Sequence, residues 1–309
     1  MTILSIVFFK TISVLLSVVI GFLAGRYSKV ERDSIASLLF YFISPIVFFA
    51  IPASTTLTVS ALSITVVTFC IASLLSIFSY YFFGRYWQDH TRNIIALSAG
   101  TANGGYFMLP IASALFDDHT LSVYMMAVIG VNLFESSVGF YICARNFSNT
   151  PESILKVIKL PILNVFLLGC LFSFAGFTLP DFLDDFIYNM KGAFSILGMI
   201  MVGLYLATLK RFEIDIKFTL ATFLAKFIFY PIGVNIFILL DKLIFKWYDD
   251  DDYSALRLLS TAPMAANIIV IASLQKFHPE KVATTVFLSL LFVVVYMPVM
   301  VSIFLSDLN

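Results

Sequence analysis

Two stretches of the chain place helix-breaking residues and an asparagine inside long apolar runs. Glycine weakens a helix and proline removes a backbone donor, so each stretch predicts a break in a helix. A break frees backbone N–H groups at the start of the next half-helix, where an anionic ligand is favoured. The two asparagine amides can hydrogen-bond the same ligand. The predicted substrate-binding residues are Asn103, Gly104, Gly105 and Pro110 in the first stretch, and Pro263 and Asn267 in the second.

Two ionisable residues also lie inside apolar runs, where charge is costly and a function is expected. Asn132 comes three residues before Glu135 and Gly139 four after it, so a regular helix would place all three on one face. We interpret Asn132 as a substrate contact and Glu135 as a coupling or gating group. The alternative is that Glu135 lies near the cytoplasmic end of its helix, where water or Arg145 would satisfy its charge. Lys226, the other candidate coupling or gating residue, could pair with Glu135, neutralise an anion, or extend to the membrane surface.

The composition predicts that lipid surrounds these runs. Hydrophobic residues make up 60% of the 309 residues and charged residues 12%, against about 45–50% and about 25% in soluble domains. Ten runs approach the roughly 20 residues that a membrane-crossing helix needs. Their continuity argues against the alternating pattern of a β-barrel. The runs are 3–25, 34–52, 62–83, 92–116, 120–144, 158–176, 192–209, 217–240, 254–276 and 281–305.

No motif indicates enzyme chemistry. The three histidines fall at loop positions, and the sequence has no metalloprotease, nucleophile-elbow or phosphate-loop motif. The three cysteines lie in apolar runs and are interpreted as buried hydrophobes. A net charge of zero predicts no nucleic-acid partner. We therefore expect no enzyme activity, catalytic residue, metal or cofactor.

Positive charge is distributed unevenly between the loops. Loops after odd-numbered runs carry 13 lysines and arginines, and loops after even-numbered runs carry 4. Loops rich in lysine and arginine stay in the cytoplasm, so the loops after odd-numbered runs are expected there. Both termini are then expected on the non-cytoplasmic side of the membrane. The first positive charge, Lys10, lies within the first run, so that run is expected to remain as a membrane span rather than a cleaved signal.

The starts of the ten runs repeat at offsets of 155 to 162 residues. If each half of the chain has five helices, an odd number, the second half would begin on the opposite side of the membrane from the first. This inverted repeat is typical of secondary transporters, and the two predicted breaks fall in matching helices. The expected organisation is a first five-helix repeat over 1–145, a cytoplasmic linker over 146–157 and a second repeat over 158–309.

Three short motifs resemble the auxin efflux carrier family, which includes plant auxin carriers and bacterial malonate carriers. Asn103 to Pro110 is similar to its Asn-x-Gly-x-x-Gly-Leu-Pro run, and Ala262 to Asn267 resembles its Met-Pro-x-Ala-x-Asn run. Gly176 to Pro180 is similar to its turn between the sixth and seventh helices. Two departures are Met108, in place of a glycine, and the absence of an acidic residue from 62–83.

The resemblance implies an all-α integral membrane fold of ten helices, like that of bile-acid symporters and sodium/proton antiporters. Helices 1, 2, 6 and 7 would form a scaffold, and helices 3–5 and 8–10 a transport domain with broken helices 4 and 9 crossing. The implied function is alternating-access transport, with efflux favoured, of small organic anions such as carboxylates. A channel or a ligand sensor on this fold is the alternative. The expected location is a bacterial inner membrane; proton coupling and a homodimer remain open.

Overall fold

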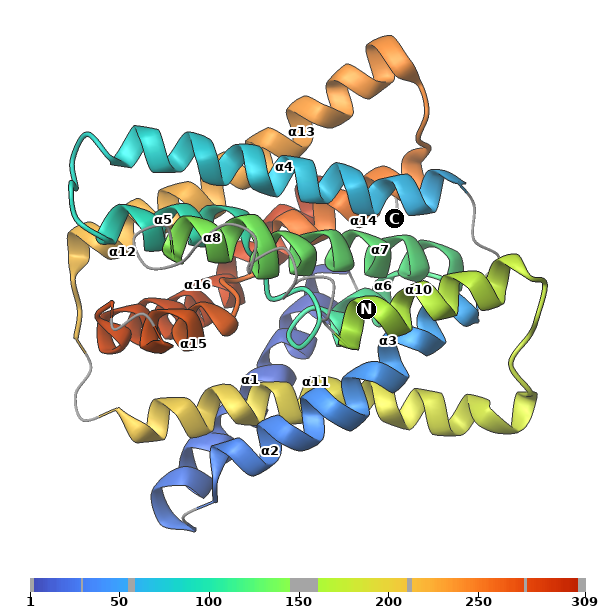
Figure 1. Ribbon diagram of the computed structural model, residues 1–309, viewed down its shortest axis with the longest axis horizontal. Helices are drawn as coiled ribbons and strands as arrows, with labels where there is room; N and C mark the ends of the chain where they lie inside the picture. The colour runs from blue at the N-terminus through green and yellow to red at the C-terminus, as the bar shows by residue number, and fades with distance from the viewer. Residues whose placement is uncertain are drawn as a thin grey trace.

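A computed structural model describes residues 3–28, 30–54, 59–144, 161–209, 213–274 and 277–304, and within these ranges every regular element is helical (Figure 1). The expected linker over 146–157 lies outside the described residues. The continuous helices are α1 (Ile3–Tyr27), α4 (Val59–Phe83), α10 (Pro161–Phe174), α11 (Asp184–Thr208) and α16 (Pro279–Phe304), and a short 3-10 turn, η3 (Asp181–Leu183), precedes α11.

Three further helical stretches contain π-helical turns, which insert an extra residue into a helix. They are α2 (Arg32–Leu38), η1 (Leu39–Ile43) and α3 (Ser44–Ala53); α7 (Asp118–Phe134), η2 (Glu135–Gly139) and α8 (Phe140–Ala144); and α12 (Ile216–Leu224), η4 (Ala225–Phe229), α13 (Tyr230–Leu240) and η5 (Asp241–Phe245). The sequence did not predict these turns. Glu135 begins one of them and Lys226 lies in another.

The two expected breaks are confirmed. The fourth run folds as α5 (Thr91–Gly100) and α6 (Leu109–Leu115), and the ninth as α14 (Asp250–Ser260) and α15 (Asn267–Leu274). Among the described residues, seven helical stretches are long and apolar enough to cross a membrane, and α10 contributes a shorter apolar helix. The protein is therefore a multi-helix membrane protein. The count of ten crossings and the inverted repeat stay predictions.

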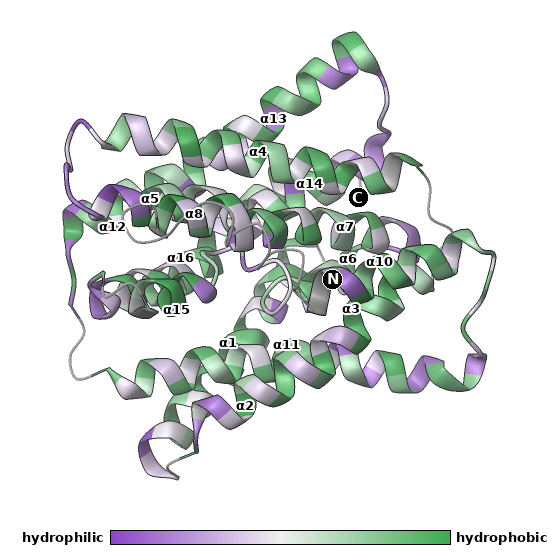
Figure 2. Ribbon diagram, in the orientation of Figure 1, coloured by the Kyte–Doolittle hydropathy of each residue, from purple (hydrophilic) through white to green (hydrophobic). Residues whose placement is uncertain are grey.

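The outer surface suits hydrocarbon. Large apolar side chains such as Leu16, Leu74 and Val295 are more than half exposed. Figure 2 shows hydrophobic residues along the middle of most helices and hydrophilic residues gathered near their two ends, at the left and right of the view. Because an exposed backbone polar group is costly in lipid, a helix that satisfies its own hydrogen bonds is the fitting element for such a surface.

The helices pack in two groups. The first helix group contains α1, α2, α3, α10 and α11, and α1 packs along α11 (Figure 1). A Cβ atom at Gly21 or Gly203 would collide with the backbone of the opposite helix, so only glycine permits this close crossing. The second helix group contains α4, α5, α7, α8 and α12 to α16, with α4 packed against both α5 and α7, and its helix α16 also packs against α1 of the first group. Whether the two groups form separate domains stays a prediction.

Candidate functional site

The two helix breaks contact each other in the interior. The backbone N–H of Asn103 donates to the carbonyl of Pro263 over 2.9 Å, which joins the first break to the second. The Asn103 side-chain Oδ1 accepts from the N–H of Phe107 over 3.1 Å. In the second break, the N–H of Met264 donates to the Ser289 hydroxyl over 3.3 Å. Backbone groups that the missing helical turns leave free are thus satisfied locally.

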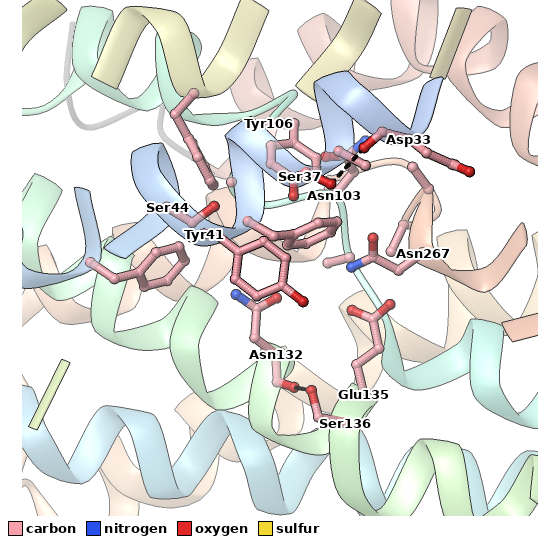
Figure 3. Close-up of a pocket in the computed structure, with 18 residues that line it drawn as sticks. Asp33, Ser37, Tyr41, Ser44, Asn103, Tyr106, Asn132, Glu135, Ser136 and Asn267 are labelled. Atoms are coloured by element: carbon pink, nitrogen blue, oxygen red, sulfur yellow. Dashed lines mark hydrogen bonds between the residues drawn. The ribbon is translucent and has the colours of Figure 1, made fainter. Parts of the chain in front are cut away.

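A cavity of about 510 Å³ lies where the two breaks meet the first helix group. The second helix group contributes amides and a carboxyl group from the breaks and from the α7–η2 region. The first group contributes Phe48 of α3, Phe194 of α11, and Ser37 and Tyr41 from α2 and η1. Figure 3 shows Asn132, Glu135 and Asn267 around the cavity, with the Tyr41 ring beside Asn132. Amides, hydroxyls and aromatic rings around such a volume are typical of a small-molecule site.

Glu135 and Asn267 form the polar centre of the cavity. The Asn267 side chain hydrogen-bonds the Glu135 carboxyl group, and Figure 3 shows the two groups facing each other. Glu135 is 5% exposed, which contradicts the alternative of a helix end open to water. Its Oε1 atom has no hydrogen-bond partner in the part of the chain that the structure describes. Asn267 is the first residue of α15, so the carboxyl group lies near the positive end of that half-helix.

Three aromatic side chains line the cavity next to the first break. The Phe194 ring lies 4.8 Å from the Tyr106 ring and 5.7 Å from the Phe48 ring, measured between centroids. The Ser195 hydroxyl donates to the carbonyl of Tyr106. A Cβ atom at Gly198 would overlap the Tyr106 ring, so glycine leaves the space that this ring occupies. We call Phe48, Tyr106 and Phe194 the aromatic plug.

A smaller cavity of about 140 Å³ also lies between the two helix groups. Its lining includes Ser54 just after α3, Asp118 and Ser122 of α7, and Lys191 of α11. Lys191 is attracted by the charges of Asp118 and of its own helix's Asp184. The attraction between Lys191 and Asp118 acts across the boundary between the first and second helix groups.

The structure brings five predicted residues to the larger cavity: Asn103, Gly105, Asn132, Glu135 and Asn267. The other three predicted substrate contacts lie outside its lining. The carbonyl of Gly104 accepts from the Tyr124 hydroxyl over 2.8 Å, and Pro110 lies in the first turn of α6. Pro263 supplies the carbonyl that joins the breaks. These contacts stabilise the region where the two breaks meet.

Lys226 lies apart from the cavity. Its side chain is fully buried, with Nζ 4.0 Å from the centroid of the Tyr230 ring. The expected reach to the membrane surface is therefore wrong. The expected pair with Glu135 is also wrong, because Nζ has no hydrogen-bond partner among the described residues. Its coupling role stays a prediction.

Sequence reasoning missed the cavity wall formed by the first helix group. Asp33, Ser37, Tyr41 and Ser44 belong to a stretch that has no break comparable to the two breaks in the second group. A pattern in the sequence could have indicated this wall. Asp33, Ser37 and Tyr41 are spaced by four residues, which places polar groups on one face of a helix.

Comparison with known proteins adds one finding. The model of the membrane transport protein family matches residues 6–301, nearly the whole chain. A search of curated proteins gave no match. The match includes both breaks and every described helix that lines the cavity, and it confirms the resemblance drawn from the three motifs. The chain therefore belongs to the membrane transport protein family, the family of the auxin efflux carriers.

Proposed function

We propose that the protein is a secondary carrier that exports small organic acids by alternating access. The observation that carries this proposal is the cavity of about 510 Å³ at the meeting point of two broken helices. Broken helices at matched positions are typical of transporter substrate sites. The amides of Asn132 and Asn267 would orient a polar end of the substrate, Asn103 would hold the shape of the first break, and the aromatic plug would contact the apolar part of the substrate.

The walls of the cavity support movement of one helix group past the other. A substrate in the cavity touches Tyr41 and Phe194 of the first group and Asn132 and Asn267 of the second. Sliding of the second group would carry the substrate past the aromatic plug toward the smaller cavity. Rigid-body movement of one helix bundle against another is the common route to alternating access.

The position of the cavity mouth supports export. Exposed Asp33 of α2 lines the cavity and follows closely in sequence after Arg26, Lys29 and Arg32, which belong to the first predicted loop. A loop with this charge is expected in the cytoplasm. The described conformation would then load substrate from the cytoplasm, with the aromatic plug closing the route to the opposite side.

Counterflow separates the carrier from a channel or a sensor. Purified protein would be reconstituted in liposomes, with radiolabelled malonate outside and unlabelled malonate or indole-3-acetate inside. A carrier predicts saturable uptake that internal substrate accelerates, compared with protein-free liposomes. Uptake that neither saturates nor responds to internal acid would indicate a channel, and absence of uptake with retained binding would indicate a sensor.

A further inference from the structure

The binding cavity holds acidic groups and no basic side chain. Among its 18 lining residues, Asp33 lies exposed at the mouth and Glu135 is buried, and none is lysine, arginine or histidine. An organic anion would therefore meet a second carboxylate. Like charges at short range in a poorly solvated site repel strongly, so the pair is stable only if the charge is reduced.

Within the described residues of the neighbouring helices, no cation balances Glu135. Its π-helical turn packs against α4, α5, α7 and α8. Helices α4 and α8 carry no charged residue. Arg92 of α5 lies over the Tyr80 ring, and Asp118 and His119 occupy the far end of α7. The remaining titratable groups around the cavity are the hydroxyls of Tyr41 and Tyr106, of which Tyr106 interacts electrostatically with Glu135.

The Glu135 carboxyl group has an unused hydrogen-bonding position. Asn267 satisfies part of it, whereas Oε1 has no partner among the described residues. A buried polar atom without a partner is costly, so a ligand that completes the group is favoured. An ionised carboxylate ligand offers only acceptors. A proton between the two carboxyl groups would provide the missing hydrogen bond and remove one negative charge.

We propose, building on the carrier function above, that Glu135 and the substrate carboxylate share one proton in the cavity, so that each organic anion travels with one proton. The loading step takes one anion and one proton from the same side. The release step returns Glu135 to its unprotonated form and delivers the anion and the proton to the other side. The Asn267 amide and the start of α15 stabilise the negative charge that remains on the pair.

Proton uptake on binding tests this proposal directly. Purified full-length protein would be titrated with indole-3-acetate, and with tryptamine as the amine of matched shape, in buffers of different ionisation enthalpy. Between about pH 6 and pH 8 the free acid stays an anion and the free amine a cation. At each pH where Glu135 is ionised in the free protein, the wild type should take up one proton for each bound acid, and its Kd should rise about tenfold per pH unit.

The Glu135→Gln variant should bind indole-3-acetate without proton uptake and with a Kd independent of pH, because the amide donates permanently. The Asp185→Asn control removes an exposed carboxylate outside the cavity and should behave as the wild type. Two results would overturn proton sharing without affecting the proposed carrier function. One is that the wild type binds the acid without taking up a proton, and the other is that Glu135→Gln still takes one up. Binding of tryptamine alone, or of neither probe, would overturn both proton sharing and the organic-acid class.

Discussion

Asn103 and Asn267 occupy corresponding breaks, yet their amides have different partners. The Asn103 side chain is committed to the N–H of Phe107 and to the sulfur of Met199, both within the fold. The Asn267 side chain faces the Glu135 carboxyl group in the cavity. Asn103 is therefore expected to hold the shape of the break, and Asn267 to contact the ligand.

Substitution of each asparagine by alanine should separate these roles. Asn267→Ala should weaken ligand binding by about 10- to 150-fold, the equivalent of about 1.5–3 kcal/mol for a hydrogen bond to a charged group, with little loss of thermal stability. Asn103→Ala should lower both the melting temperature and transport. Asn235→Ala is the control, since its amide bonds the carbonyl of Pro231 outside the cavity. Normal binding and transport in both variants would contradict a site at the crossover.

Asp215 supports a prediction about pH. Its Oδ2 lies 2.6 Å from Nζ of Lys281, and its Oδ1 accepts from the N–H of Phe218 at the start of α12. The hydrogen bond from Lys281, followed by the one from Phe218, lowers the pKa of Asp215 below its ordinary value. A lowered pKa contributes stability above about pH 4, which is lost as pH falls through the folded-state value.

Asp215→Asn keeps a capping oxygen and removes the charge. Because Asp215 is more than a third exposed, solvent screening limits the loss to about 0–1 kcal/mol at neutral pH. Asp215→Ala also removes the cap and should cost about 1 kcal/mol more. The difference in melting temperature between wild type and Asp215→Asn, measured in detergent, should shrink as the medium becomes acidic. A difference that grows on acidification would contradict the pairing.

The sequence predicted individual site residues where a local rule applied. Asn103, Asn267 and Glu135 were visible because a break or a charge inside an apolar run is physically costly. The sequence did not predict that Lys226 lies apart from Glu135. Contacts between distant helices depend on packing, which the sequence of one segment does not specify. Gly139 was also misplaced: the π-helical turn from Glu135 alters the regular spacing, and Gly139 packs against Leu97 instead of lining the cavity.

At the scale of elements, the aromatic plug connects α11 to the first break. The Tyr106 ring occupies the space above Gly198, and the Ser195 hydroxyl holds the Tyr106 carbonyl one turn away. These two contacts join the first helix group to the second at the end of the cavity that the aromatic plug is proposed to close. They should stabilise the described conformation relative to one in which the second group has moved.

Gly198→Ala should weaken this closure, because the added methyl group overlaps the Tyr106 ring. We expect a thiol at position 122, on the smaller cavity, to react several-fold faster with a water-soluble maleimide in this variant. The parent would have its three native cysteines replaced. Gly192→Ala is the matched control on the same helix, since nothing lies within 4 Å of its added Cβ atom. Equal labelling of both variants and the parent would show that Tyr106 does not close the cavity.

Sequence rules predicted the elements unevenly. Glycine, proline and asparagine located both breaks to within a few residues, because these residues act on the backbone where they stand. The four π-helical turns among the described residues have no comparable residue signature. Such a turn is selected by packing between helices, so hydropathy alone gave the length of each run and not its internal geometry.

For the whole molecule, composition predicted the membrane environment. The pairing of α1 with α11, and of α4 with α5 and α7, was implied only by resemblance to a family. No residue pattern in the chain specifies which helices meet, since lipid-facing and protein-facing sides are both apolar. The small residues at the α1–α11 crossing are the exception, and they could have indicated that contact.

The last prediction concerns orientation. Helix α1 has 25 residues, or about 37 Å at 1.5 Å per residue, enough to cross a bilayer. The chain start and the cavity mouth near Ser37 must then lie on opposite sides, and the distribution of 13 positive loop residues against 4 places the mouth in the cytoplasm. In a cysteine-free parent, Thr2→Cys should react with an impermeant reagent from outside intact cells. Ser37→Cys should react only in inverted vesicles, and added organic acid should slow that reaction. Labelling of both positions from one side would contradict the crossing by α1, whereas exchanged sides would keep the fold and reverse the direction of loading.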